Sequence, residues 1–215
     1  MDDSPTLPEG RIAGGISAHA LSLPNLLTYA RVIAVPALVL CFYLEGNASR
    51  WFSFAVFVLA SISDFFDGYL ARAWGQQSAI GRLLDPIADK LLVATALMLL
   101  VWSGTIGSWS LLAAIVILVR EISVSGLREF LAGLKNVSVP VSTLAKYKTT
   151  MQMVAIGFLL IGPAGDRLLR YYLTADLGIF TYVGLLLLWV SALITLYTGY
   201  DYFRASMRHL MEDAS

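Results

Sequence analysis

The residues of this sequence best suited to chemistry are four aspartates in a short stretch that is otherwise mostly apolar. Asp64 and Asp67 are three residues apart, and Asp85 and Asp89 are four residues apart. On helices, either spacing puts both carboxylates on one face. The link at 75–81 is short and contains glycine, glutamine and serine, so we expect the two helices to form an antiparallel hairpin. Such a hairpin would bring the four carboxylates into one small volume.

Carboxylates gathered among apolar residues repel one another and lose hydration, so they must be neutralised. They can share protons or bind cations, and oxygen ligands suit hard cations such as Mg²⁺, Mn²⁺ or Ca²⁺. Two divalent ions among four aspartates would form a two-metal site, which stabilises the attacking and leaving oxygens of a phosphoryl displacement. Capping of helix ends at the surface is the simpler interpretation, but it accounts poorly for four carboxylates in register.

Two small residues accompany the aspartates. Gly68 follows Asp64 by about one helical turn, and Ala71 follows Asp67 by the same spacing. Their lack of bulk leaves room for a flat group or for close approach of a backbone. Ordinary packing of small residues between membrane helices is the alternative.

The composition indicates a membrane protein with several spans. Of the 215 residues, 58% are hydrophobic and only 14% are charged, and the mean hydropathy is +0.72. This is too apolar for a soluble domain of that length. The formal net charge is zero, which gives no indication of nucleic-acid binding. The first 22 residues lack the apolar centre of a signal peptide, so we expect no cleavage there.

Six segments are long and apolar enough to be predicted as transmembrane helices: 23–44, 51–71, 83–102, 109–131, 145–161 and 178–200. We therefore predict an all-α polytopic membrane protein in which six transmembrane helices surround a polar, metal-binding cavity.

The predicted spans divide the chain into three parts and set its orientation. Residues 1–22 would form an N-terminal juxtamembrane segment, 23–201 the transmembrane catalytic domain, and 202–215 a tail. Residues 163–177 are expected to form a loop. Lys and Arg are concentrated on the side that carries both termini, so the positive-inside rule places that side, and the opening of the cavity, in the cytoplasm.

The first predicted span carries a polar strip of Asn25, Thr28 and Arg31, which recur every three residues and so share one helix face. Anchoring at the membrane interface explains Asn25 but not Arg31, which lies further in. An arginine at that depth needs an anion or a carboxylate as its partner.

Further cations lie in the fourth and fifth predicted spans. Arg120, Glu121 and Arg128 lie in one span, and Lys146 and Lys148 open the next. Glu121 and Arg128 are seven residues apart on one face, so a network within the helix is one interpretation. The lysines could simply anchor the cytoplasmic end of their span. The functional alternative is that these cations bind an anionic group.

The complete pattern D-x2-D-G-x2-A-R-x8-G-x3-D-x3-D runs from Asp64 to Asp89 without a departure. It resembles the signature of the CDP-alcohol phosphotransferase family of integral membrane enzymes. Eight fixed residues at fixed gaps make the pattern specific. The stretches LPNLLTYARVIAVP, LDPIADKLLVA, REISVSGLRE and AKYKTTMQM further resemble the bacterial phosphatidylglycerophosphate synthases of that family.

The resemblance implies a reaction and its substrates. The donor would be CDP-diacylglycerol and the acceptor sn-glycerol 3-phosphate, with release of CMP. The enzyme would be a homodimer in the bacterial cytoplasmic membrane, with two Mg²⁺ or Mn²⁺ ions bound by Asp64, Asp67, Asp85 and Asp89.

The resemblance also implies individual roles. Asp89 would be the general base that takes a proton from the acceptor hydroxyl. The polar strip and the small residues would lie beside CDP-diacylglycerol, a set made up of Asn25, Thr28, Arg31, Gly68, Ala71 and Arg72. A phosphate-bearing acceptor needs cations, and arginine binds phosphate in a forked manner and lysine as a point charge; the candidates are Arg120, Arg128, Lys146 and Lys148.

Two other functions stay open at this point. The motif is shared with family enzymes that use other acceptors, such as phosphatidylinositol-phosphate, phosphatidylserine and cardiolipin synthases. Carboxylates in a helical bundle also occur along the ion paths of cation transporters. Against a transporter, the aspartates cluster towards one face of the membrane, and no matched pair of broken helices is present.

Overall fold

The structure is a computed structural model that describes residues 23–74, 79–133, 143–173 and 178–212. These residues form helices and connecting turns, with no strand among them. The predicted all-α class is therefore confirmed.

Six helices follow one another along the described chain, and each corresponds to one predicted span. They are α2 Leu23–Phe42, α3 Gly46–Trp74, α4 Ala79–Trp102, α5 Ser110–Gly133, α6 Thr143–Leu173 and α7 Ile179–Glu212.

The prediction of six spanning helices is confirmed only in part. Within the described residues, four segments are long and apolar enough to cross a membrane: Asn25–Phe42, Ser110–Leu131, Tyr147–Tyr172 and Ile179–Met207. The helices α3 and α4 are of sufficient length, with 29 and 24 residues. Neither is among these four segments, and both carry charged residues of the aspartate motif.

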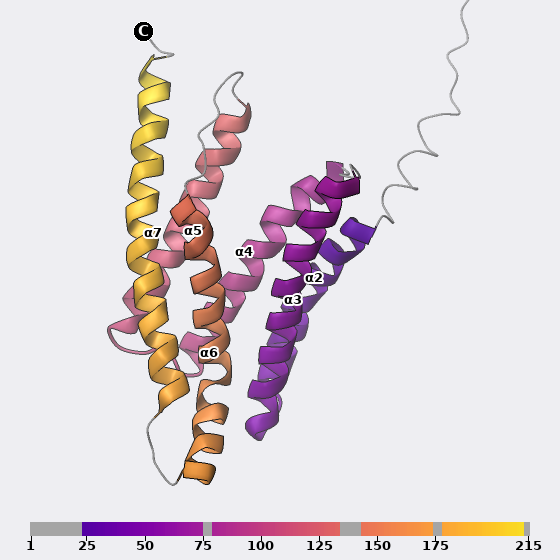
Figure 1. Ribbon diagram of the computed structural model, residues 1–215, viewed down its shortest axis with the longest axis vertical. Helices are drawn as coiled ribbons and strands as arrows, with labels where there is room; N and C mark the ends of the chain where they lie inside the picture. Colours follow the sequence, from indigo (N-terminus) through magenta and orange to yellow (C-terminus); the bar gives the residue numbers. More distant parts are fainter. Residues whose placement is uncertain (1–22, 75–78, 134–142, 174–177, 213–215) are drawn as a thin grey trace, which may run out of the picture.

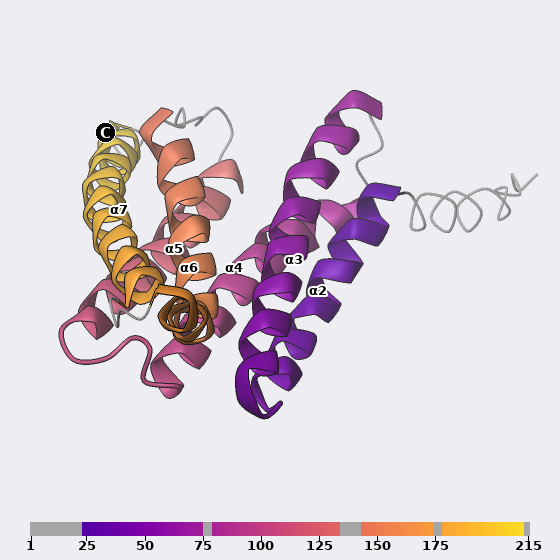
Figure 2. The same cartoon turned by 60° about the horizontal axis from the view of Figure 1, so that its bottom comes forward.

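The helices pack in two groups joined by α4 (Figures 1 and 2). In one group, α2 packs along both α3 and α4, while α3 and α4 contact each other only sparsely. In the other, α7 packs against both α5 and α6, and α6 also contacts α3. The motif helices α3 and α4 run in opposite directions, as predicted, but they splay apart instead of forming a close hairpin (Figure 1).

Apolar side chains from every helix form one core between the two groups. Fully buried members come from each helix: Leu38, Phe57, Leu97, Ile117, Leu159 and Leu188. Because this core occupies only one face of each helix, many large apolar side chains point outward. A bilayer is the environment in which such outward-facing apolar side chains are stable.

The predicted loop at 163–177 is wrong over most of its length, since α6 continues through Pro163 to Leu173. Two glycines allow α7 to pack closely against this extension. A Cβ atom at Gly162 would lie 2.8 Å from the hydroxyl oxygen of Thr181, and one at Gly165 would lie 2.9 Å from the ring of Phe180. The proline and the charged residues predicted an end to the helix here, whereas packing against α7 extends it.

A side chain from this extension caps the next helix. The carboxylate of Asp166 accepts hydrogen bonds from the backbone N–H groups of Phe180 at 2.8 Å and Thr181 at 3.2 Å. The Thr181 hydroxyl donates a third bond to it at 2.5 Å. The first N–H groups of a helix have no partner within the helix, so Asp166 joins the end of α6 to the start of α7.

We expect the substitution Asp166→Ala to lower the free energy of unfolding by about 1 kcal/mol, because two N–H groups at the start of α7 lose their acceptor. Thermal unfolding of the purified protein in detergent would measure the effect. Asp201→Ala is the matched control, since Asp201 is an exposed aspartate on α7. Equal unfolding temperatures for the two variants would contradict the capping role.

Candidate active site

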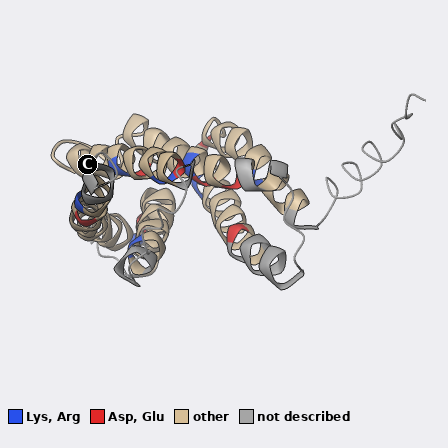
Figure 3. Cartoon of the chain, turned by 90° about the horizontal axis from the view of Figure 1, so that it is seen from above, with Lys and Arg blue, Asp and Glu red and all other residues tan. Residues whose placement is uncertain are grey.

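A cavity of about 1090 Å³ lies between α3, α4, α5 and α6. Its apolar wall includes Phe54, Phe57 and Phe158. Its charged lining includes the predicted residues Asp64, Asp89, Arg120, Arg128 and Lys148, together with Glu121 and with Lys90, which was not predicted. In Figure 3 most of the ribbon is uncharged, and charged residues of both signs occur where the two groups of helices meet.

The structure brings three of the four motif aspartates towards one another. Asp64 comes from α3, while Asp85 and Asp89 come from α4. Asp64 lies within electrostatic range of both Asp85 and Asp89. Asp67 is on α3, but its side chain lies outside the described residues. Among the side chains that are described, no three acidic, histidine or cysteine groups are close enough together to bind one ion.

The polar strip of α2 contacts the motif aspartates. A guanidinium nitrogen of Arg31 lies 2.6 Å from Oδ1 of Asp64. The hydroxyl of Thr28 donates a hydrogen bond to Oδ1 of Asp85 at 2.5 Å. The prediction that Arg31 needs a carboxylate or another anion as partner is thus confirmed.

The polar strip itself is buried within the bundle. Asn25, Thr28 and Arg31 are all buried, with 1–2% of their surfaces exposed. None of these three residues is among those that line the described cavity. The strip thus lies outside the lining of the cavity. Its assignment to the binding of CDP-diacylglycerol stays a prediction.

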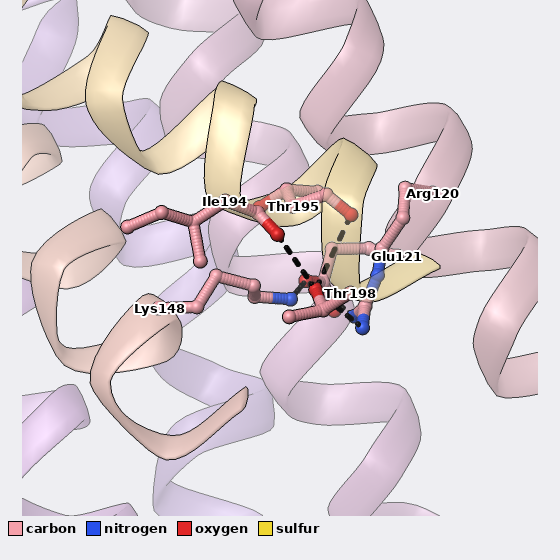
Figure 4. Close-up of polar contacts among 6 residues, drawn as sticks. All are labelled: Arg120, Glu121, Lys148, Ile194, Thr195 and Thr198. Atoms are coloured by element: carbon pink, nitrogen blue, oxygen red, sulfur yellow. Dashed lines mark hydrogen bonds and ion pairs between the residues drawn. The ribbon is translucent and has the colours of Figure 1, made fainter. Parts of the chain in front are cut away.

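The predicted cations meet around one carboxylate. Lys148 of α6 is 2% exposed and forms an ion pair with Glu121 of α5. Arg120 lies 3.4 Å from the same Glu121 oxygen and donates a hydrogen bond of 3.4 Å to the hydroxyl of Thr198 on α7. Thr198 in turn donates to the backbone carbonyl of Ile194 at 2.8 Å. Figure 4 shows these residues converging from three helices.

Arg128 lies apart from this network. It is exposed and lines the cavity, and its guanidinium carbon is 5.8 Å from the centre of the Tyr202 ring. This distance permits a cation–π interaction. Of the four predicted acceptor cations, the structure brings Arg120, Arg128 and Lys148 to the cavity. The side chain of Lys146 lies outside the described residues, as do those of Gly68, Ala71 and Arg72.

The sequence did not reveal two partners of the cations. These are the acidic Glu121, which pairs with Lys148, and the uncharged Thr198, which accepts a hydrogen bond from Arg120. Glu121 was considered as a partner of Arg128 on the same helix, but the structure pairs it with Lys148, 27 residues away. The only available signal was that a lysine so close to an apolar span needs a counter-charge. Nothing in the sequence indicated which acid provides it.

The ion pair between Glu121 and Lys148 generates a stability prediction. Glu121→Gln leaves the buried ammonium of Lys148 without its counter-charge, so we expect the free energy of unfolding to fall by about 3 kcal/mol. In the double variant Glu121→Gln/Lys148→Met the buried ammonium is removed together with its counter-charge, while Arg120 keeps its hydrogen bond to Thr198, and most of the loss should be recovered. Chemical or thermal unfolding in detergent would measure both. A double variant less stable than the single one would contradict the pairing.

Comparisons with known proteins agree with this site. The family model for CDP-alcohol phosphatidyltransferase matches residues 21–197. A protein of Rickettsia bellii is 46% identical over 188 residues, which cover 87% of this chain and 97% of that protein. A protein of Cereibacter sphaeroides is 39% identical, covering 89% and 98%, and one of Shigella flexneri is 41% identical with the same coverage.

All three relatives carry the name CDP-diacylglycerol–glycerol-3-phosphate 3-phosphatidyltransferase. The family match spans all of the motif and most of the helices that form the cavity. This chain belongs to the CDP-alcohol phosphatidyltransferase family.

Proposed function

We propose that this protein transfers the phosphatidyl group of CDP-diacylglycerol to sn-glycerol 3-phosphate, releasing CMP and forming phosphatidylglycerophosphate. The observation that carries the proposal is one cavity that is lined by motif carboxylates from α3 and α4 and by arginine and lysine from α5 and α6. Relatives at 39–46% identity over 86–89% of the chain bear the name of this activity. A volume of about 1090 Å³ suits a nucleotide together with a small second substrate.

The chemistry of the carboxylates fits divalent metal ions. Asp64, Asp85 and Asp89 interact electrostatically within apolar surroundings, and their oxygens suit Mg²⁺ or Mn²⁺. With Asp67, they are the residues that would hold two such ions. When bound, the ions would neutralise the pyrophosphate and stabilise negative charge on the departing CMP.

Asp89 is the proposed general base. It lines the cavity, whereas Arg31 forms its ion pair with Asp64 and Thr28 donates its hydrogen bond to Asp85. It would accept the proton of the 1-hydroxyl of glycerol 3-phosphate. That oxygen forms a bond to the β-phosphorus of CDP-diacylglycerol, and the bond from that phosphorus to the CMP oxygen breaks.

The acceptor phosphate would bind to the cations on α5 and α6. Lys148 and Arg120 already share Glu121, so they supply a fixed positive wall with part of its charge compensated. Arg128 is the cation with the most exposed side chain of the three, and it is the best placed to form a forked pair with the phosphate. Lys146, one turn from Thr149 on α6, would add to this group.

The donor would enter from the other side of the cavity. Gly68, Ala71 and Arg72 of the motif would accommodate the cytidine and balance the phosphate charge. The apolar wall with Phe54, Phe57 and Phe158 is compatible with the diacylglycerol part of the donor, whose chains would remain in the bilayer.

We also propose that α3 and α4 cross the membrane with the other four helices. Their lengths are sufficient, and Asp64 and Asp85 meet partners on α2 inside the bundle, which is where intramembrane charges are found. The distribution of Lys and Arg then places the cavity opening at the cytoplasmic face of the bacterial cytoplasmic membrane. Association into a homodimer is proposed from family resemblance alone.

The reaction is tested with purified protein, CDP-diacylglycerol and Mg²⁺ or Mn²⁺ in detergent, by following CMP release. Glycerol 3-phosphate, inositol 1-phosphate and serine are added singly, with an EDTA control. We expect release with glycerol 3-phosphate alone and its loss with EDTA. Release with another acceptor would assign the chain to a different branch of the family, and release that survives EDTA would contradict the metal requirement.

Asp89→Asn is expected to lower kcat by about 100-fold or more, since a positioned base contributes roughly 10²–10⁴ in rate. The same CMP-release assay at saturating substrates measures it. Asp201→Asn, at an exposed position on α7, controls for loss of one negative charge and should retain turnover. Full turnover by Asp89→Asn would rule out the base assignment.

Arg128→Gln is expected to raise the KM for glycerol 3-phosphate by about 10-fold or more, because a hydrogen bond between charged groups contributes roughly 1.5–3 kcal/mol. The KM for CDP-diacylglycerol should change far less. Arg204→Gln removes an exposed arginine from α7 and serves as the control. An equal rise in both KM values would contradict a specific role of Arg128 in binding the acceptor.

A further inference from the structure

The two motif helices depend on a third helix for their relative position. The motif places its aspartates on α3 and α4, yet these helices contact each other only sparsely. Helix α2 packs along both of them. The distance between a carboxylate on α3 and one on α4 is therefore determined largely through α2.

The polar strip of α2 makes this connection at the aspartates themselves. Thr28 donates to Asp85 of α4 at 2.5 Å, and Arg31 pairs with Asp64 of α3 at 2.6 Å. The two α2 residues are three apart, so both point from one helix face. With 2% and 1% of their surfaces exposed, neither has the freedom of a surface side chain.

Both contacts are made to the Oδ1 atom of the aspartate. A carboxylate has two oxygens that accept several bonds, so the second oxygen of each aspartate stays available for a further ligand. Outer-shell hydrogen bonds of this kind orient metal ligands and typically change metal affinity by about 10- to 100-fold. Thr28 carries no charge, so its contact orients Asp85 without neutralising it.

We propose that Thr28 and Arg31 are positioning residues that set the separation and orientation of the Asp85 and Asp64 carboxylates for a divalent cation. The proposal rests on the metal-dependent function proposed above. It gives these residues a task other than contact with CDP-diacylglycerol, and it assigns part of the metal site to a helix outside the aspartate motif.

The test uses purified full-length protein in a detergent without anionic groups, with Mn²⁺ as the probe and no substrate. Loss of the electron paramagnetic resonance signal of free Mn²⁺ measures binding. Thr28→Val keeps the side-chain shape but cannot donate, and we expect its Kd for Mn²⁺ to rise by about 10-fold or more. Thr28→Ser keeps the donor and should retain affinity close to that of the unmodified protein.

Thr195→Val is the matched control, because Thr195 is a fully buried threonine on α7 and should leave the Kd unchanged. Arg31→Lys keeps the charge but loses the planar guanidinium, and it too should weaken Mn²⁺ binding. Its Kd for Mn²⁺ provides a second test of the positioning role if Thr28→Val does not fold. A Kd for Thr28→Val equal to that of the unmodified protein, or equal weakening by Val and Ser, would overturn the proposal.

Asp64→Asn separates this proposal from the proposed function. If the unmodified protein shows no Mn²⁺ binding that depends on Asp64, the metal site itself is wrong, and the positioning role falls with it. If that binding is present and is the same in Thr28→Val and Arg31→Lys, only the positioning role is wrong.

Discussion

The free-energy cost of placing charge among apolar helices governs this structure. A charged side chain in such surroundings is stable only with a partner, and within each group of helices an ion pair joins two neighbouring helices. Arg31 of α2 pairs with Asp64 of α3, and Lys148 of α6 pairs with Glu121 of α5. Under the proposed function, each of these pairs would also fix the place of a residue that the reaction requires, so stability and function would depend on the same contacts.

The two ion pairs lie on opposite sides of one cavity. The side formed by α3 and α4 carries an excess of negative charge, and the side formed by α5 and α6 an excess of positive charge. On the side of α3 and α4, the described aspartates Asp64, Asp85 and Asp89 outnumber the cations Arg31 and Lys90. On the side of α5 and α6, arginine and lysine outnumber Glu121. A divalent cation matches the first side and a phosphate matches the second. In the proposed reaction, an acceptor that carries its own phosphate would be held across the cavity from the carboxylates, with its hydroxyl directed towards them.

Local features of the fold could be predicted from the sequence, because they depend on spacing along one helix. The positions of the helices, the shared face of Asn25, Thr28 and Arg31, and the need of Arg31 for an anionic partner all follow from residues a few positions apart. The aspartate motif also identified the family. These inferences required no knowledge of how the helices pack.

Features that depend on contacts between distant segments could not be predicted. The pairing of Lys148 with Glu121 joins residues 27 apart, and several acids were equally plausible partners. The continuation of α6 through Pro163 depends on glycines that admit α7, a contact that periodicity does not encode. The splay of α3 and α4 is a third case, since a short link favours a hairpin but does not determine how closely its arms pack.

That splay limits what the aspartate motif can do by itself. A fragment that contains only α3 and α4 carries the whole motif but lacks the helix that packs against both arms. Its carboxylates would have no fixed separation, however faithfully the motif sequence were retained. The motif is therefore not a portable module that could be grafted into another bundle. During synthesis α2 precedes both motif helices, so the surface on which they assemble has already been made when they emerge.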